Sequence, residues 1–219
     1  MQRIPEPELM DDPAQAQAYA GADFSAPHDA FVAHFAARFP GFANGRVLDL
    51  GCGAADVVLR FARAYPAAHI VGVDGADAML DLARAAVARA GCMERIVLWR
   101  MRLPDAALAA QAFDAVLSNS LLHHLHDPLV LWQSLKQAAK PGAALCVMDL
   151  SRPATLDEVM QLTARYASDA PELLRRDFFN SLCAAYRADE VSAQLRQTGL
   201  AHLQIENVSD RHLLIWGFC

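Results

Sequence analysis

Residues 47–56 read VLDLGCGAAD, an apolar run that ends in an acid and then breaks into glycine and alanine. A strand that feeds a glycine turn at the start of a helix often brings backbone N–H groups close to a ligand. The stretch therefore predicts a buried strand followed by a ligand-binding turn. The rest of the chain has to indicate which ligand the turn accepts.

Short runs of valine, isoleucine and leucine alternate with alanine-rich helical stretches from Arg46 onward. This alternation is typical of a parallel sheet that helices cover on both faces. The last two apolar runs are separated only by VSD at 208–210, which predicts an antiparallel hairpin at the sheet edge. We predict an α/β fold with a doubly wound, mostly parallel sheet and an antiparallel last strand. The predicted strands are 46–50, 69–74, 95–101, 113–120, 143–150, 202–207 and 211–218; the predicted helices are 55–66, 76–91, one opening at Asp127–Pro128, and 188–199.

Two segments lie outside this alternation. Residues 1–45 hold a proline-rich start and an amphipathic helix at 27–40, and residues 151–188 form a long excursion before the last helix. Segments beside the carboxyl ends of strands commonly form lids and substrate pockets. We predict a helical N-terminal lid over 1–45 and one Rossmann-like domain over 46–219, with a helical excursion at 151–188.

Composition limits the class of protein. The chain has 219 residues, of which 54% are hydrophobic, enough for one domain with a full core. Its net charge of −6 and the absence of a lysine or arginine cluster disfavour nucleic acid as a partner. No signal peptide or membrane-spanning run is recognisable, so a cytoplasmic protein without a membrane partner is expected. The five cysteines follow no metal or disulfide spacing, and the oligomeric state stays open.

The acids near the glycine turn narrow the choice of ligand. Asp74 ends the second predicted strand, 23 positions after Gly51, close to the spacing at which an acid can accept hydrogen bonds from a ribose diol. A nicotinamide dinucleotide needs a third glycine where this chain has Asp56, and a carboxylate beside a pyrophosphate is unfavourable. The Asp-x-Gly-x-Gly order at 49–53 suits a nucleoside that carries an amino acid and a positive centre.

Residues 46–150 resemble the class I, Rossmann-like methyltransferases that depend on S-adenosylmethionine. The resemblance covers roughly half of the chain strongly. VLDLGCGAAD matches the first motif of that family, VGVDGADAML the second, FDAVLSNSLLHHLHDP the fourth and KPGAALCVMDLSRP the motif after it. Four motifs in the right order are specific, whereas the glycine turn alone would be weak.

The resemblance implies S-adenosylmethionine as the cofactor and assigns residues to it. Asp49 helps to hold the amino group, Gly51 and Gly53 let the backbone approach the methionine part, and Asp74 with Gly75 meets the ribose. Met79 lies against the adenine, Asn119 borders the methionyl group, and Tyr19 closes over the cofactor as part of the lid. Many relatives carry an acid that binds the adenine after the third strand, whereas residues 99–102 of this chain include no acid. The adenine would then be bound by backbone atoms near Met101 and Arg102, or by Asp105.

The family often has a third glycine at position 55, where this chain has alanine. The replacement is harmless if the backbone there is helical, as the predicted helix over 55–66 implies.

Methyl transfer mainly requires that the acceptor is aligned and water is excluded, since positioning alone can contribute roughly 7–11 kcal/mol. His123 and His124 are candidate catalytic bases because histidine titrates near neutral pH; the alternative is that they cap the strand. No metal site is predicted, because adjacent side chains diverge and the sequence offers no further ligand group.

Four residues at or after the end of the fifth strand are candidates for the substrate site. Asp149 and Arg152 could orient a polar substrate, or they form a structural ion pair. Phe178 and Phe179 could line an aromatic pocket, or they belong to the core. Arg211 and His212 are interpreted as plain edge-strand residues, with a bound anion as the alternative.

The leading hypothesis is an S-adenosylmethionine-dependent enzyme that methylates a small-molecule acceptor at O, N or S. The alternative is a non-catalytic module that binds the cofactor, or a partner subunit of a true enzyme. A nicotinamide oxidoreductase is a third reading, which Asp56 disfavours.

Overall fold

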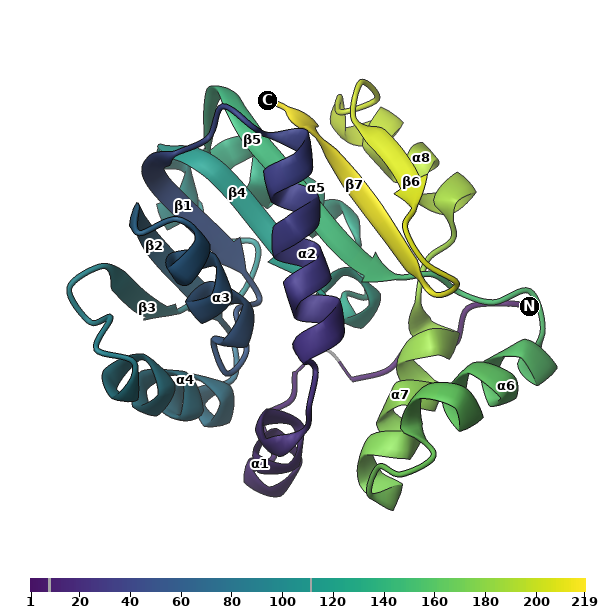
Figure 1. The fold of residues 1–219 in the computed structure, drawn as a ribbon. Coiled ribbons are helices and arrows are strands. Elements are labelled where there is room, and N and C mark those ends of the chain that lie inside the picture. The colour runs from purple at the N-terminus through teal and green to yellow at the C-terminus, as the bar shows by residue number, and fades with distance from the viewer. Residues whose placement is uncertain (8, 111) are drawn as a thin grey trace.

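The computed structural model describes residues 1–7, 9–110 and 112–219. Within these residues seven strands form one sheet in the order β3-β2-β1-β4-β5-β7-β6 (Figure 1). The pairs from β3 to β5 are parallel, whereas β7 is antiparallel to both β5 and β6. The predicted doubly wound, mostly parallel sheet with an antiparallel end is therefore confirmed.

The order of the strands across the sheet reverses at β1, which lies between β2 and β4. A ligand in such a sheet binds at this switch point. The strands are β1 (Asn44–Leu50), β2 (Ala67–Asp74), β3 (Ile96–Arg100), β4 (Phe113–Asn119), β5 (Ala139–Leu150), β6 (Gln204–Asn207) and β7 (His212–Phe218). The α-helices are α1 (Pro13–Gly21), α2 (Ser25–Arg38), α3 (Asp56–Ala64), α4 (Asp77–Arg89), α5 (Leu129–Ala138), α6 (Leu156–Ala167), α7 (Glu172–Ala184) and α8 (Ala188–Thr198), with short 3-10 turns η1 (Ala106–Ala110) and η2 (Leu122–His124).

Successive side chains of the central strands enter opposite faces of the sheet, because a strand repeats every two residues. Val47 lies in the core that α2, α3 and α4 cover, and Leu48 lies in the core that α5 and α8 cover. Phe35 of α2 and Trp132 of α5 are fully buried at the centres of these two layers. The strands are nearly continuous apolar runs in the sequence because both faces of the sheet are buried.

The segment before β1 divides into two parts. Phe31 and Phe35 of α2 are fully buried against α3, so this helix belongs to the core. Residues 1–7 and 9–24, including α1, lie with α6 and α7 beyond the carboxyl ends of the parallel strands (Figure 1). We therefore restrict the proposed lid to residues 1–24.

Element boundaries differ from the predicted ones by a few residues. β5 begins at Ala139 instead of 143. Pro128 lies just before α5 rather than at its first position, although the Asp127 carboxylate accepts a hydrogen bond from the N–H of Leu129 as expected of a capping acid. Among the described residues, no helix has both the length and the apolar character needed to cross a membrane.

Candidate active site

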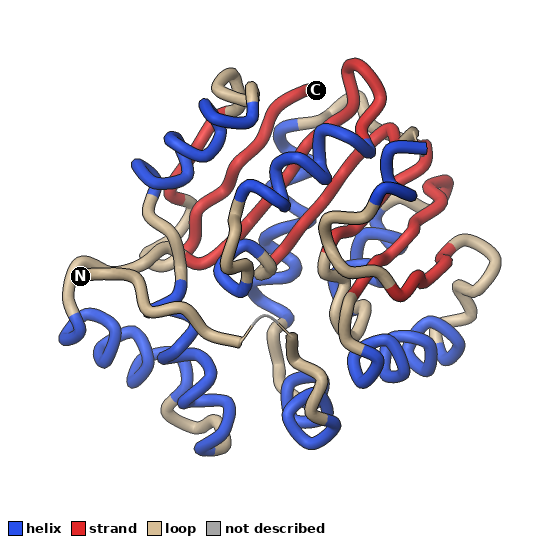
Figure 2. Tube along the Cα trace, turned by 180° about the vertical axis from the view of Figure 1, so that it is seen from behind, coloured by secondary structure: helices blue, strands red, loops and turns tan. Residues whose placement is uncertain are grey.

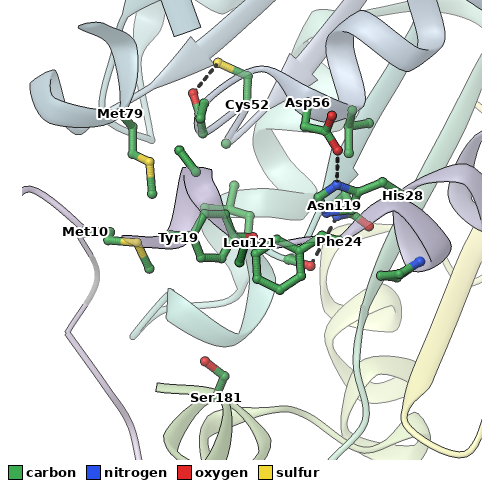
Figure 3. Close-up of a pocket in the computed structure, with 18 of the residues that line it drawn as sticks. Met10, Tyr19, Phe24, His28, Cys52, Asp56, Met79, Asn119, Leu121 and Ser181 are labelled. Carbon is green, nitrogen blue, oxygen red and sulfur yellow. Dashed lines mark hydrogen bonds and ion pairs between the residues drawn. The ribbon is translucent and has the colours of Figure 1, made fainter. Parts of the chain in front are cut away.

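A pocket of about 1200 Å³ opens where β1, β2 and β4 end. Its walls come from these strand ends, from the lid with α1, and from α7 of the excursion. Tyr19, Phe24 and Leu121 project into the middle of the pocket, with Met79 toward one end and Ser181 of α7 toward the other (Figure 3). This is the switch point at which an open α/β sheet binds its ligand.

The glycine turn has two glycines for two different reasons. Gly51 has φ +76°, and a Cβ added there would lie 2.9 Å from the Leu121 side chain. Gly53 has φ +51°, and a Cβ there would meet nothing within 4 Å. Gly51 is thus required by packing and backbone conformation, whereas the missing side chain of Gly53 leaves open space in the pocket.

Ala55, directly before α3, is left-handed, with φ +69° and ψ +19°. The expectation of helical dihedral angles is therefore wrong. Relative to glycine, alanine at this position has three effects on the free energy of folding. Its left-handed backbone costs about 1–2 kcal/mol, whereas the buried methyl group and the stiffer unfolded chain each stabilise the folded state by up to about 1 kcal/mol.

Because these terms nearly cancel, Ala55→Gly is expected to change the free energy of unfolding by less than about 1 kcal/mol. Urea unfolding of both proteins at equal pH measures the difference. A change of several kcal/mol in either direction would show that another interaction fixes this residue.

Two buried oxygen atoms beside the turn have no hydrogen-bond partner. They are Oδ1 of Asp49, which is 2% exposed, and Oδ1 of Asn119, which is 9% exposed. Burial, reinforced by the charge of Asp74, raises the pKa of Asp49 to about 7. Unpaired acceptors in a pocket wall are costly unless a ligand donates to them, so this wall favours a cationic ligand.

Asp74 at the end of β2 holds the turn. Its carboxylate accepts hydrogen bonds from the N–H groups of Gly53 and Ala76, both at 2.9 Å. Burial raises the pKa of Asp74, and these backbone donors lower it again in part. The residue thus joins the ends of β1 and β2 while also lining the pocket.

Apolar side chains line the end of the pocket beyond Asp74. Met79 is 4% exposed and packs near Tyr19, and Met101 and Arg102 follow β3. Gly75 lies here too, where a Cβ would come within 2.9 Å of Leu9. Asp105 does not line the pocket, and its carboxylate accepts from the N–H of Ala107.

The opposite end of the pocket carries the two histidines. His123 is 3% exposed, and its Nδ1 lies 2.5 Å from Asp149 Oδ1. Burial lowers the pKa of His123, but the Asp149 carboxylate outweighs it, so the pKa lies above its ordinary value. Burial, reinforced by His123, lowers the pKa of His124 to about 3. The two predicted candidates therefore differ strongly in basicity.

Glu6 of the lid contacts both histidines, which sequence reasoning missed. Its Oε1 lies 3.5 Å from His123 Nε2 and 3.3 Å from His124 Nδ1. The two imidazole rings lie 4.2 Å apart. The adjacent rings thus stay together instead of diverging, and Glu6 adds a third possible ligand group beside them.

The structure brings most predicted residues into one pocket and leaves Asp105, Asp149, Arg152 and Phe179 outside its wall. The other predicted cofactor residues, both histidines and Phe178 line it. Asp149 lies behind His123, and Arg152 is 4% exposed and forms an ion pair with Glu190 at 2.5 Å instead of with Asp149. Phe179 packs against the small core between α6 and α7. Asp149, Arg152 and Phe179 are thus not placed to touch a substrate directly.

Some pocket residues carry no local sequence signal. Asp56 bonds to His28 of α2 at 2.6 Å and to Arg60 at 2.8 Å, and the hydrogen bond from His28 is the largest cause of its pKa of about 2. Arg211 and His212 line the pocket as well, beyond the plain edge role expected of them. Only the tertiary fold brings α2 and β7 to this wall.

Comparison with known proteins decides the family. Residues 47–142 match the methyltransferase domain family. The chain therefore contains a methyltransferase domain, in agreement with the resemblance to the class I S-adenosylmethionine-dependent methyltransferases. This family match supports the expected enzyme class and S-adenosylmethionine as its cofactor.

Among curated proteins, this methyltransferase is 36% identical over 110 residues to the ubiquinone/menaquinone biosynthesis C-methyltransferase of Syntrophotalea carbinolica, covering 50% of this chain and 45% of that one. The chain spans about half the length of the curated relatives it matches. An O-methyltransferase family protein from Burkholderia thailandensis has a TM-score of 0.71 at 21% identity, over 94% of this chain and 60% of that one. The plantazolicin methyltransferase in complex with S-adenosylhomocysteine gives 0.71 at 13% identity, over 94% and 91%. At these identities the structures establish the shared fold.

Proposed function

We propose that this methyltransferase transfers a methyl group from S-adenosylmethionine to an O, N or S nucleophile of a small molecule. The observation that carries the proposal is the pair of unpartnered buried oxygens on Asp49 and Asn119 beside the glycine turn. The cofactor has an ammonium group and a sulfonium centre, both cationic. The wall therefore fits the charge of this cofactor at its methionine end.

The other pocket residues fit the remaining parts of the cofactor. Asp74 would accept from the ribose hydroxyls, with lone pairs in addition to those that bind Gly53 and Ala76. Met79 and Met101 would flank the adenine, and Tyr19 would close over it from the lid. Adenine recognition would then rely on packing and backbone groups, since Asp105 is turned to Ala107.

When bound, S-adenosylmethionine supplies an electrophilic methyl group and leaves as a neutral thioether. The chain's own contribution is to hold the acceptor in line and to keep water out. The acceptor would enter between η2 and α7, where His123, His124, Phe178 and Ser181 line the pocket. The raised pKa of His123 makes it the better of the two candidate bases, and Asp149 would orient its ring from behind.

The curated relatives support a small-molecule acceptor, since their names place them in ubiquinone and menaquinone biosynthesis or in rifamycin methylation. The net charge of −6 supports the exclusion of nucleic acid as acceptor. We also propose that the protein is cytoplasmic. The oligomeric state is left open.

The test is transfer of a radiolabelled methyl group from S-adenosylmethionine to a fractionated extract of small metabolites. The expected result is a labelled product of low molecular mass that disappears with Asp74→Ala. Tight cofactor binding without any labelled product would contradict catalysis and favour the non-catalytic module instead.

The two glycines are expected to respond differently to alanine. Gly53→Ala places a methyl group in the open space of the pocket, so cofactor affinity should fall about tenfold or more with a loss of stability near 1–2 kcal/mol. Gly51→Ala meets Leu121 at 2.9 Å and should lose about 2–4 kcal/mol of stability. Thermal melts and cofactor titrations of both variants separate the two effects; equal behaviour would contradict the assigned reasons.

A further inference from the structure

A cluster of three side chains lies at the acceptor end of the pocket. Glu6, His123 and His124 each offer one ligand atom, and these atoms all lie within 4.8 Å of one another. All three side chains are largely buried, with exposures of 10%, 4% and 19%. They come from the lid and from η2, which are far apart in the sequence.

The spacing of the ligand atoms is close to that of a metal site. Glu6 Oε1 lies 3.3 Å from His124 Nδ1 and 3.5 Å from His123 Nε2. In a tetrahedral zinc site with ligands about 2.1 Å from the metal, neighbouring ligand atoms lie about 3.4 Å apart. Two of the three edges thus need little adjustment, and the third is at most 4.8 Å long.

Outer partners orient two of the three ligands. Asp149 accepts from Nδ1 of His123, which leaves Nε2 directed at Glu6. The hydroxyl of Ser181 donates to Oε1 of Glu6 at 3.0 Å. A carboxylate behind a ligating histidine is the usual arrangement around protein-bound metal ions, because it fixes the ring and raises its donor strength.

The lid is fastened so that Glu6 stays in this position. Arg3 donates to the carbonyl oxygens of Ala184 at 2.5 Å and of His123 at 2.8 Å, and Ile4 N–H donates to Cys183 at 3.0 Å. Figure 2 shows the N-terminal segment running between the sheet and the pair α6 and α7. The third ligand is therefore held by the same residues that join the lid to α7.

We propose that Glu6, His123 and His124 bind one divalent first-row transition-metal ion, such as Zn²⁺. Two imidazoles and one carboxylate form a ligand set for such an ion, and they leave at least one coordination position. His123 and His124 line the pocket, so the position open to an acceptor lies on the pocket side.

The role of this ion in methyl transfer rests on the proposed function. An acceptor hydroxyl bound to the ion would lose its proton to solvent more readily, because a metal ion lowers the pKa of a bound O–H group. The resulting oxygen would form the bond to the methyl carbon while the carbon–sulfur bond breaks and its electrons stay on sulfur. His123 would then act as a ligand rather than as the base.

The experiment is calorimetric titration of the full chain with zinc chloride after dialysis against a chelator. We expect one ion per chain, at least 100-fold weaker binding in Glu6→Gln and His124→Gln, and 10–100-fold weaker binding in Asp149→Asn. His202→Gln is the matched control, because His202 is exposed and bonds to the Phe218 carbonyl away from the cluster. Thermal melts of each variant confirm that it is folded.

Zinc binding that is absent, or that survives both Glu6→Gln and His124→Gln, overturns the site. S-adenosylmethionine is titrated into the same preparations without zinc, and Glu6→Gln should keep its affinity for it. If the unmodified chain does not bind the cofactor, the proposed function is contradicted. The metal site is tested separately by the zinc titration.

Discussion

Asp49→Asn is expected to make the cofactor-free protein more stable above neutral pH and to weaken its binding of S-adenosylmethionine. Burial is the main reason that the pKa of Asp49 rises from 3.8 to about 7. The folded state therefore binds a proton that the unfolded state releases, so the wild-type chain loses stability as the pH rises from about 4 to 7. Each unit of pKa difference corresponds to about 1.4 kcal/mol.

The advantage of the variant should consequently grow over that pH range and stay constant above it, reaching about 1–4 kcal/mol at pH 8. Urea unfolding at pH 4, 6 and 8 measures it. Cofactor affinity should fall about 10–100-fold, since a hydrogen bond to a charged group contributes about 1.5–3 kcal/mol. A variant that is less stable at pH 8, or that keeps full affinity, would contradict the role of the unpaired oxygen.

Asp74→Asn is expected to weaken binding of both S-adenosylmethionine and S-adenosylhomocysteine by 100-fold or more. The carboxylate has two tasks, to hold the N–H groups of Gly53 and Ala76 and to accept from the ribose. An amide retains one acceptor oxygen and turns a donor toward an N–H group or the ligand, so one task fails in either orientation.

Asp105→Asn is the matched control for this prediction. Asp105 also follows β3 but bonds to Ala107 outside the pocket wall, so its replacement should leave cofactor affinity unchanged. Titrations of both variants with both ligands give the comparison. Loss of affinity in Asp105→Asn would return Asp105 to the adenine site, and retention in Asp74→Asn would remove Asp74 from the ribose site.

The regular features of the fold were predictable because their causes are local. The alternation of Val47 and Leu48 between two cores follows from the strand period, and the glycines at 51 and 53 mark a turn wherever they occur after a strand. Asp49 is recognisable by its position two residues before Gly51, and Asp74 by its position at the end of the next strand.

The acceptor end was less predictable because its parts meet only through the tertiary fold. Glu6 lies in a segment without periodicity, and nothing local indicates that it reaches His123, 117 positions later. Arg152 shows the reverse case, since its position after β5 suggested a substrate contact, whereas its guanidinium bonds to Glu190 and Ala185. The helical dihedral angles expected at Ala55 were wrong because alanine rarely adopts the left-handed backbone that it has here.

The central claim is that the pocket at the ends of β1, β2 and β4 binds S-adenosylmethionine through Asp49 and Asp74. Calorimetric titration of the full chain at pH 8 with S-adenosylmethionine and S-adenosylhomocysteine, with Asp74→Ala as the control, tests it most directly. The account predicts one site per chain with micromolar affinity that the variant loses. Absence of binding in the wild-type chain, or equal binding in Asp74→Ala, would contradict it.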